Sequence, residues 1–171
     1  MKVKSLPALL VMLAMTLSAL GADEWKEVDE HFLLTIPSNW KRDKGQPIDS
    51  NAGGYKGQNT ELEFDEVGGF MYPKGKSESA IADLKKKEAD PSLLKSGEEI
   101  WRVAGRLADF TNGRVDPELY GKRRFTNVAG LFIPYKNGEG YLSIWILYRS
   151  DKDLPVVKRV LRRVRWKEKD N

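Results

Sequence analysis

The chain has 171 residues, the length of one ordinary domain once its N-terminal segment is set aside. Hydrophobic residues make up 40% of it and charged residues 32%, a globular balance that excludes a disordered chain. Cysteine is absent, which excludes disulfide bonds and zinc–thiolate sites. The formal net charge is +4 and falls to +2 without Lys2 and Lys4, so nucleic acid is not an expected partner.

The first 21 residues have the pattern of a secretory signal peptide. Lys2 and Lys4 form a positive start, an apolar run extends from Leu9 to Leu17, and Ala19-Leu20-Gly21 predicts cleavage after Gly21. A retained membrane anchor is the alternative, but the apolar run is shorter than the ~20 residues that span a bilayer. We therefore expect a secreted or periplasmic protein with a single domain over residues 22–171.

Alternation of apolar and polar residues predicts three strands, over 31–37, 60–67 and 99–109. In the third of these, Gly105 indicates a bulge or a close backbone approach. A Pro37-Ser38-Asn39 turn after the first strand would fold Trp40 back onto the core. An acidic segment at 23–30 is expected to be flexible. Stretches rich in Gly, Asn, Asp and Lys predict connections at 41–49, 51–59 and 112–122, with at most a ragged edge strand between the first two.

Two helices are predicted from their start signals. Ser77 is a favoured N-cap residue, and the helix that it opens ends before Pro91, after which a short turn of helix extends to Gly97. The second helix starts at Asp153-Leu154-Pro155. Spacings of 3, 4 and 7 place apolar residues on one of its faces, namely Val157, Val160, Leu161 and Val164. The opposite face is basic and comprises Lys158, Arg159, Arg162 and Arg163.

A β-hairpin over Val128 to Arg149 is predicted as the centre of the fold. Asn137-Gly138 suits a two-residue turn between two runs rich in branched and aromatic residues. In the second run both alternating faces are largely apolar, which is typical of a central strand covered on both sides.

The order of these elements resembles the PsbP-like proteins. The resemblance rests on four segments: the corner Ile36-Pro37-Ser38-Asn39-Trp40, the charged strand Glu61 to Val67, Trp101 to Gly105, and the closing Arg163-Val164-Arg165-Trp166. That fold is shared with a small Ran-binding nuclear transport factor of the Mog type and with many secreted bacterial proteins. The resemblance implies an α+β domain in which an antiparallel sheet is sandwiched between helices (α/β/α), and a non-catalytic binding or assembly role. No family site maps residue by residue onto this chain.

Catalytic chemistry has little support in the sequence. His31 is the only histidine and stands beside no nucleophile motif, so we assign no catalytic, cofactor or metal residue and expect no enzyme. Glu61, Glu63 and Asp65 share one strand face and could hold a cation or serve as an acid and base pair. A solvated outer face explains the same pattern. A carboxylate- or cation-dependent hydrolase therefore remains an alternative function.

Partner binding is the function that the sequence favours. The partner-binding candidates are an aromatic residue of the acidic lead segment, another of the glycine-rich stretch 53–57, and three arginines of the last helix: Trp25, Tyr55, Arg159, Arg162 and Arg163. We expect a module of the cell envelope that engages a protein through a cleft between sheet and helix. A peripheral envelope protein that docks through its basic C-terminal helix is the alternative, although a helix that covers a sheet has the same pattern. The sequence leaves the oligomeric state open and indicates no cofactor.

Overall fold

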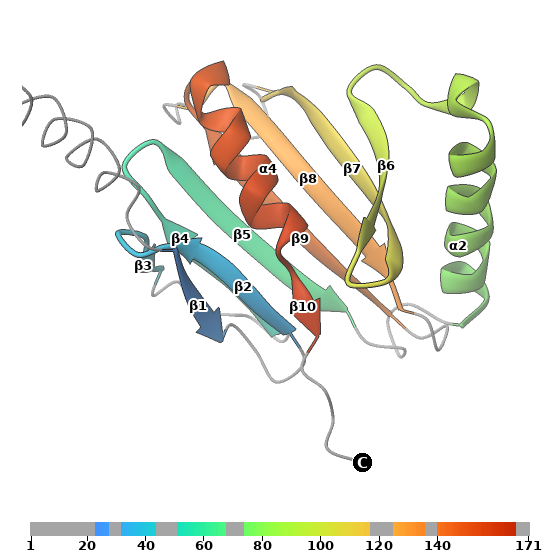
Figure 1. Cartoon of the computed structure of the whole chain (residues 1–171), viewed down its shortest axis with the longest axis horizontal. Helices are drawn as coiled ribbons and strands as arrows, with labels where there is room; N and C mark the ends of the chain where they lie inside the picture. Colours follow the sequence, from blue (N-terminus) through green and yellow to red (C-terminus); the bar gives the residue numbers. More distant parts are fainter. Residues whose placement is uncertain are drawn as a thin grey trace, which may run out of the picture.

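The computed structural model describes residues 23–27, 32–43, 51–67, 74–116, 125–135 and 140–166. The protein has an α+β fold built on a seven-stranded antiparallel sheet (Figure 1). The strands of this sheet lie in the order β3 (Lys41–Arg42), β4 (Asn51–Lys56), β5 (Thr60–Val67), β9 (Tyr141–Tyr148), β8 (Asn127–Pro134), β7 (Arg106–Arg114) and β6 (Glu98–Val103). A separate three-stranded sheet has the order β1 (Asp23–Glu27), β2 (Phe32–Pro37) and β10 (Arg165–Trp166).

The predicted central strand is β9, with three strands on either side of it in the large sheet. Four of its side chains are buried on the core side, as the alternation predicts: Leu142, Ile144, Ile146 and Tyr148. Pro134 pairs with Tyr141, a register that a two-residue turn at Asn137-Gly138 would produce. That turn itself lies outside the described residues.

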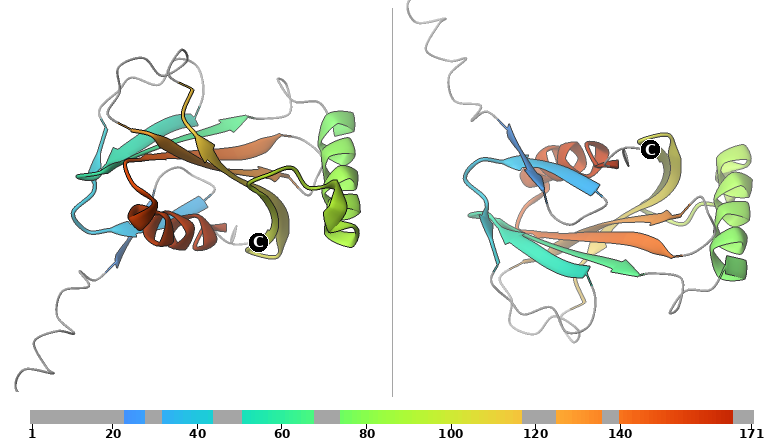
Figure 2. Two further views of the ribbon diagram at one scale, coloured as in Figure 1. Left: turned by 90° about the horizontal axis from the view of Figure 1, so that it is seen from above. Right: turned by 90° about the horizontal axis from the view of Figure 1, so that it is seen from below.

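The small sheet and α4 (Leu154–Arg162) pack together on one face of the large sheet, which we call the inner face (Figure 2). The short 3₁₀ helix η3 (Asp151–Asp153) precedes α4, and Ser150 caps it with a reciprocal capping box. The predicted apolar face of α4 is confirmed, because Val157, Val160 and Leu161 are all buried. Trp40 is buried as predicted, and its backbone N–H donates to the carbonyl oxygen of Pro37 across the predicted turn.

We call the opposite face of the large sheet the outer face. There α2 (Lys74–Ala89) packs against β6, β7 and β8, at one end of the sheet (Figure 2). This helix begins before Ser77, so the predicted N-cap is wrong. Ser77 instead lies buried one turn inside, where its hydroxyl donates to Gly140 O at 3.1 Å. The predicted stop is correct, because Asp90 caps the 3₁₀ helix η2 (Pro91–Leu93) through Ser92 N.

Several segments that were predicted as loops or as helix form strands; the predicted connection at 41–49, for example, begins with β3. The acidic lead segment forms β1 through its first half, the glycine-rich stretch forms β4, and the residues after α4 form β10. Their pairing partners explain these differences. β1 and β10 both hydrogen-bond to β2, and β4 hydrogen-bonds to the charged strand β5. The ladder bonds come from the next strand in the chain for β1 and β4 and from the other end of the chain for β10, so the composition of each segment alone is a poor guide to its structure.

The predicted bulge at Gly105 is a complete reversal of the chain. β6 and β7 form a tight hairpin in which Val103 pairs with Arg106. Ala104 and Gly105 between them both have positive φ, 47° and 76°. Positive φ at both central positions is the signature of a type I′ turn, whose twist matches that of the flanking strands. The predicted strand over 99–109 is therefore two antiparallel strands.

Candidate functional site

The outer face of the sheet carries an exposed aromatic side chain at its centre. Trp145 of β9 is 42% exposed, whereas Ile144 and Ile146 on either side of it in the sequence are fully buried. In register with Trp145 lie Glu63 on one side and Gly130 on the other. A central strand is among the most rigid parts of a sheet, so this indole is presented on a firm base.

The missing side chain of Gly130 leaves room for the indole of Trp145 to lie across β8. A Cβ atom added to Gly130 would stand only 2.3 Å from Cζ3 of Trp145 and 2.9 Å from Oγ1 of Thr111. The indole therefore extends across the bare backbone of β8 toward β7. Sequence reasoning treated Trp145 as covered on this face, and Gly130 opposite it was the available signal that the ring could lie flat on the sheet.

The neighbouring row of the outer face contains two carboxylates without donors. It runs across four strands in the order Asp65, Ser143, Phe132 and Asp109. One oxygen of Asp65 and one of Asp109 are buried, and neither has a hydrogen-bond partner. Burial raises the pKa of the Asp109 carboxyl, and the positive charge of Lys87 on α2 only partly offsets this effect. The outer face thus carries two half-buried carboxylates in the row beside its exposed indole.

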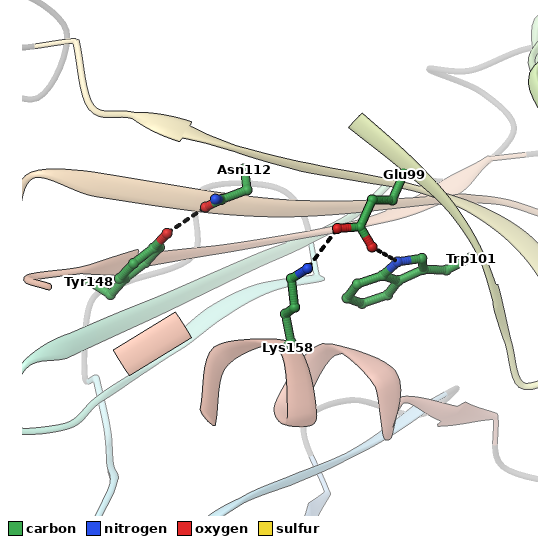
Figure 3. Close-up of polar contacts among 5 residues, drawn as sticks. All are labelled: Glu99, Trp101, Asn112, Tyr148 and Lys158. Atoms are coloured by element: carbon green, nitrogen blue, oxygen red, sulfur yellow. Dashed lines mark hydrogen bonds and ion pairs between the residues drawn. The ribbon is translucent and has the colours of Figure 1, made fainter. Parts of the chain in front are cut away.

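The inner face carries a polar cluster between β6 and α4 (Figure 3). Glu99 accepts hydrogen bonds from Lys158 Nζ at 2.6 Å and from Trp101 Nε1 at 2.8 Å. The ring of Trp101 stacks on Phe110, with ring centroids 4.0 Å apart. Burial pushes the pKa of Glu99 upward, but the two hydrogen bonds outweigh it and hold the pKa below its ordinary value. This cluster fastens helix to sheet.

A second buried polar contact lies on the same face, at the end of β9 (Figure 3). The Tyr148 hydroxyl donates to Oδ1 of Asn112 on β7. Asn112 was predicted to begin a connection, but it lies within β7 and its side chain accepts the hydrogen bond of this tyrosine. Burial raises the pKa of Tyr148, so its hydroxyl remains protonated at neutral pH and acts as a donor.

Two of the five predicted partner-binding residues have positions that differ from the expectation. Trp25 belongs to β1, where its backbone pairs with Thr35, and so it does not stand in a flexible segment. Tyr55 is in β4 and only 4% exposed, because its side chain is part of the core rather than of a loop. Tyr55 therefore offers almost no surface to a partner.

The three predicted arginines belong to the region of α4, and one of them contacts an aromatic ring. The guanidinium of Arg162 lies 4.5 Å from the ring centroid of Trp101, although its side chain is exposed. Arg163 is exposed just after the helix, and Arg159 is half-buried within it. Lys158 on the same basic face is held by Glu99 and lies over Phe110. The basic face is therefore partly used in packing.

The carboxylates of the acidic strand β5 lie on the outer face as predicted, because the alternating residues Leu62 and Phe64 are buried on the inner face. Glu61 lies 3.6 Å from Lys56 of β4 in an ion pair. Within the described ranges, no group of three or more histidine or acidic side chains is arranged to hold a metal ion. In the same part of the chain, neither helix is long and apolar enough to cross a membrane.

Comparison with known proteins finds a similarity in fold but none in sequence. No family model matches the sequence, and no curated protein sequence matches it either. A crystal structure from Bacteroides thetaiotaomicron VPI-5482 is similar, with a TM-score of 0.54 and 8% sequence identity over 88% of this chain. This chain spans about half of that protein, 51% of its length. So low an identity shows a shared fold only, and the likeness to PsbP-like proteins stays a prediction.

Proposed function

We propose that this protein is a non-catalytic binding module that engages a protein partner through the outer face of its seven-stranded sheet. The observation that carries the proposal is the exposure of Trp145 at the centre of that face. The N-terminal signal-peptide pattern supports action outside the cytoplasm, in the periplasm or beyond the cell. The proposed surface differs from the predicted cleft between sheet and helix, because the exposed indole belongs to the open outer face of the sheet.

An indole exposed on a rigid strand is a strong anchor for a partner. Tryptophan is enriched among the residues that dominate binding energy, because it buries a large area and loses little side-chain entropy. Beside it, the half-buried carboxylates of Asp65 and Asp109 would favour hydrogen-bond donors of a partner through their negative charge. The partner that fits is thus a protein segment with an apolar side chain for Trp145 and hydrogen-bond donors beside it.

The space between the sheet and α4 is less suited to this role. The apolar side chains of α4 are buried against β-strands and belong to the continuous core of the protein. The bond between Glu99 and Lys158 closes one side of that contact. A partner would have to displace packed core residues to enter, which costs several kilocalories per mole for each large side chain, on the order of 2–5.

Docking through the basic helix is the alternative that the structure favours less. Lys158 is occupied by Glu99, and Arg162 lies against Trp101. Both side chains would have to give up these contacts to reach an anionic surface. Loss of anionic liposome binding in an Arg162→Glu, Arg163→Glu variant would support this alternative, and unchanged liposome behaviour would count against it.

Site-specific photocrosslinking tests the proposal. A benzoyl-phenylalanine at position 145 is expected to give a discrete adduct in an envelope extract of the host. The substitution keeps an aromatic ring at this position, so the partner should still bind there. The matched control is position 93, since Leu93 on η2 is the other large apolar residue that is exposed in the described part of the chain, at 51%. Position 159 reports on the basic helix.

Competition makes the crosslinking test specific. Excess wild-type protein should suppress the adduct from position 145, whereas Trp145→Ser protein should not, and Leu93→Ser protein should compete like wild type. Equal adducts from positions 145 and 93, or equal competition by all three proteins, would overturn the proposal. An adduct from position 159 alone would move the interaction to the basic helix.

A further inference from the structure

A cationic side chain lies beside two neighbouring aromatic rings on the inner face, away from the surface proposed above. Arg106 is the first residue of β7, directly after the tight turn of the β6–β7 hairpin. In Figure 1 and Figure 2 the tip of this hairpin lies beside β10. The Arg106 guanidinium carbon is 3.9 Å from the ring centroid of Trp166 on β10 and 5.5 Å from that of Tyr135.

The hydrogen-bond donors of this cluster lack acceptors. A guanidinium has five N–H donors, and stacking on a ring covers its face but satisfies none of them. Among the described residues, no carboxylate forms an ion pair with Arg106, and no hydrogen bond from its guanidinium is present. Nε1 of Trp166 is a second donor, buried and without a partner. The half-buried guanidinium thus adjoins a buried donor that has no partner, because it lies over the ring that carries Nε1.

The second aromatic residue of the cluster, Tyr135, has its hydroxyl engaged elsewhere. The Tyr135 hydroxyl donates to Oε1 of Glu66, so Tyr135 contributes only its ring beside Arg106. Tyr135 also packs edge to face on Trp166, with centroids 5.3 Å apart, and Phe32 packs edge to face on the same indole at 6.4 Å. These contacts hold the indole in place and so define where its N–H group lies.

We propose that Arg106 and Trp166 form a binding site for an oxyanion, a carboxylate or a phosphate group. An oxyanion accepts hydrogen bonds from the guanidinium edge and from the indole N–H at once, which satisfies both donors of the cluster. Burial lowers the pKa of Arg106, as expected for a cation that is withdrawn from water without a counter-charge. The site requires no catalytic step and is independent of partner binding at Trp145.

Titration with small anions followed by NMR tests this site. The probes are sodium acetate and inorganic phosphate, added at constant ionic strength to the ¹⁵N-labelled protein, with Trp166→Phe used to assign the Trp166 indole signal. Two charge-assisted hydrogen bonds predict saturation with a dissociation constant on the order of 1 mM. The Trp166 indole N–H and the Arg106 Nε–H signals should shift together.

Two arginine variants distinguish this site from general charge attraction. Arg106→Gln should abolish the saturable shift, and Arg106→Lys should weaken binding at least threefold, because an ammonium keeps the charge without the planar fork. The control is Arg102→Gln, an exposed arginine of the same hairpin that pairs with Glu88 at 2.9 Å, and it should bind like wild type. A shift that stays linear for both anions, or that persists in Arg106→Gln, would overturn the site. Saturation by only one anion identifies the oxyanion chemistry that the site accepts.

Discussion

The ammonium of Lys158 lies 2.6 Å from Oε1 of Glu99 and joins α4 to β6 across 59 residues of sequence. The same carboxylate receives the indole N–H of Trp101 from two residues along the strand. One side chain therefore fastens the last helix to an edge strand of the large sheet. The pair is only partly shielded from water, since 30% of the Lys158 side chain and 44% of the Glu99 side chain are exposed.

A double-mutant cycle with Glu99→Gln and Lys158→Met should measure the strength of this pair. We expect a coupling free energy of about 0.5–1 kcal/mol at pH 7, the upper part of the range for partly exposed ion pairs. Because the pKa of Glu99 is lowered in the folded protein, this stability is present above the ordinary value of 4.5 and is lost as the pH falls through the folded-state pKa. Urea denaturation at several pH values measures both effects.

The pair formed by Arg102 and Glu88 is the control for that cycle. It joins β6 to α2 with side chains that are 63% and 38% exposed, so its coupling should be smaller. Equal coupling in the two pairs, or no coupling for Glu99 and Lys158 at pH 7, would show that the inner-face cluster does not stabilise the attachment of α4.

Substitutions in the β6–β7 turn should have opposite effects on stability. Ala104 has a φ of 47°, a conformation that costs an L-residue about 1–2 kcal/mol and that asparagine tolerates better. Ala104→Asn should therefore raise the free energy of unfolding by about 0.5–1 kcal/mol, and Gly105→Ala should lower it by about 1 kcal/mol. Urea denaturation of both variants measures these changes in the free energy of unfolding. Changes of the same sign would contradict a turn with positive φ at both positions.

Replacement of Asp109 by asparagine should stabilise the protein in a pH-dependent way. Its raised pKa means that the folded protein holds the proton more tightly than the unfolded chain, so the ionised carboxylate destabilises the fold above that pKa. This destabilisation disappears below the ordinary value of 3.8. Asp109→Asn should raise the melting temperature by about 2–4 °C at pH 7, which corresponds to about 1 kcal/mol, and leave it unchanged near pH 3.

The control for Asp109 is Asp83→Asn on α2. Asp83 pairs with Lys87 at 3.4 Å, the same lysine that attracts Asp109, but its side chain is 61% exposed. Loss of this exposed pair should lower stability slightly or leave it unchanged. A fall in melting temperature for Asp109→Asn at pH 7 would mean that attraction to Lys87 outweighs the desolvation of the carboxylate.

Sequence periodicity predicted much of the fold because it is a local property of the backbone. A period of two placed Phe32, Leu34 and Ile36 in the core, and spacings of 3 and 4 did the same for α4. Proline and the N-cap preference of aspartate located the end of α2 and the start of η2. Periodicity did not predict how the strands divide between two sheets, because β10 pairs with β2 from the other end of the chain.

The sequence by itself determined which residues alternate toward the core, and hence that β9 is a central strand of an α+β domain. Only the tertiary structure decided what lies on each face. Trp145 is exposed because α2 covers other strands, Tyr55 is buried because its side chain packs in the core beneath the small sheet and α4, and Trp166 meets Arg106 because a hairpin reaches β10. Periodicity records which side of a strand a residue occupies, whereas its exposure and its partners depend on segments distant in the chain.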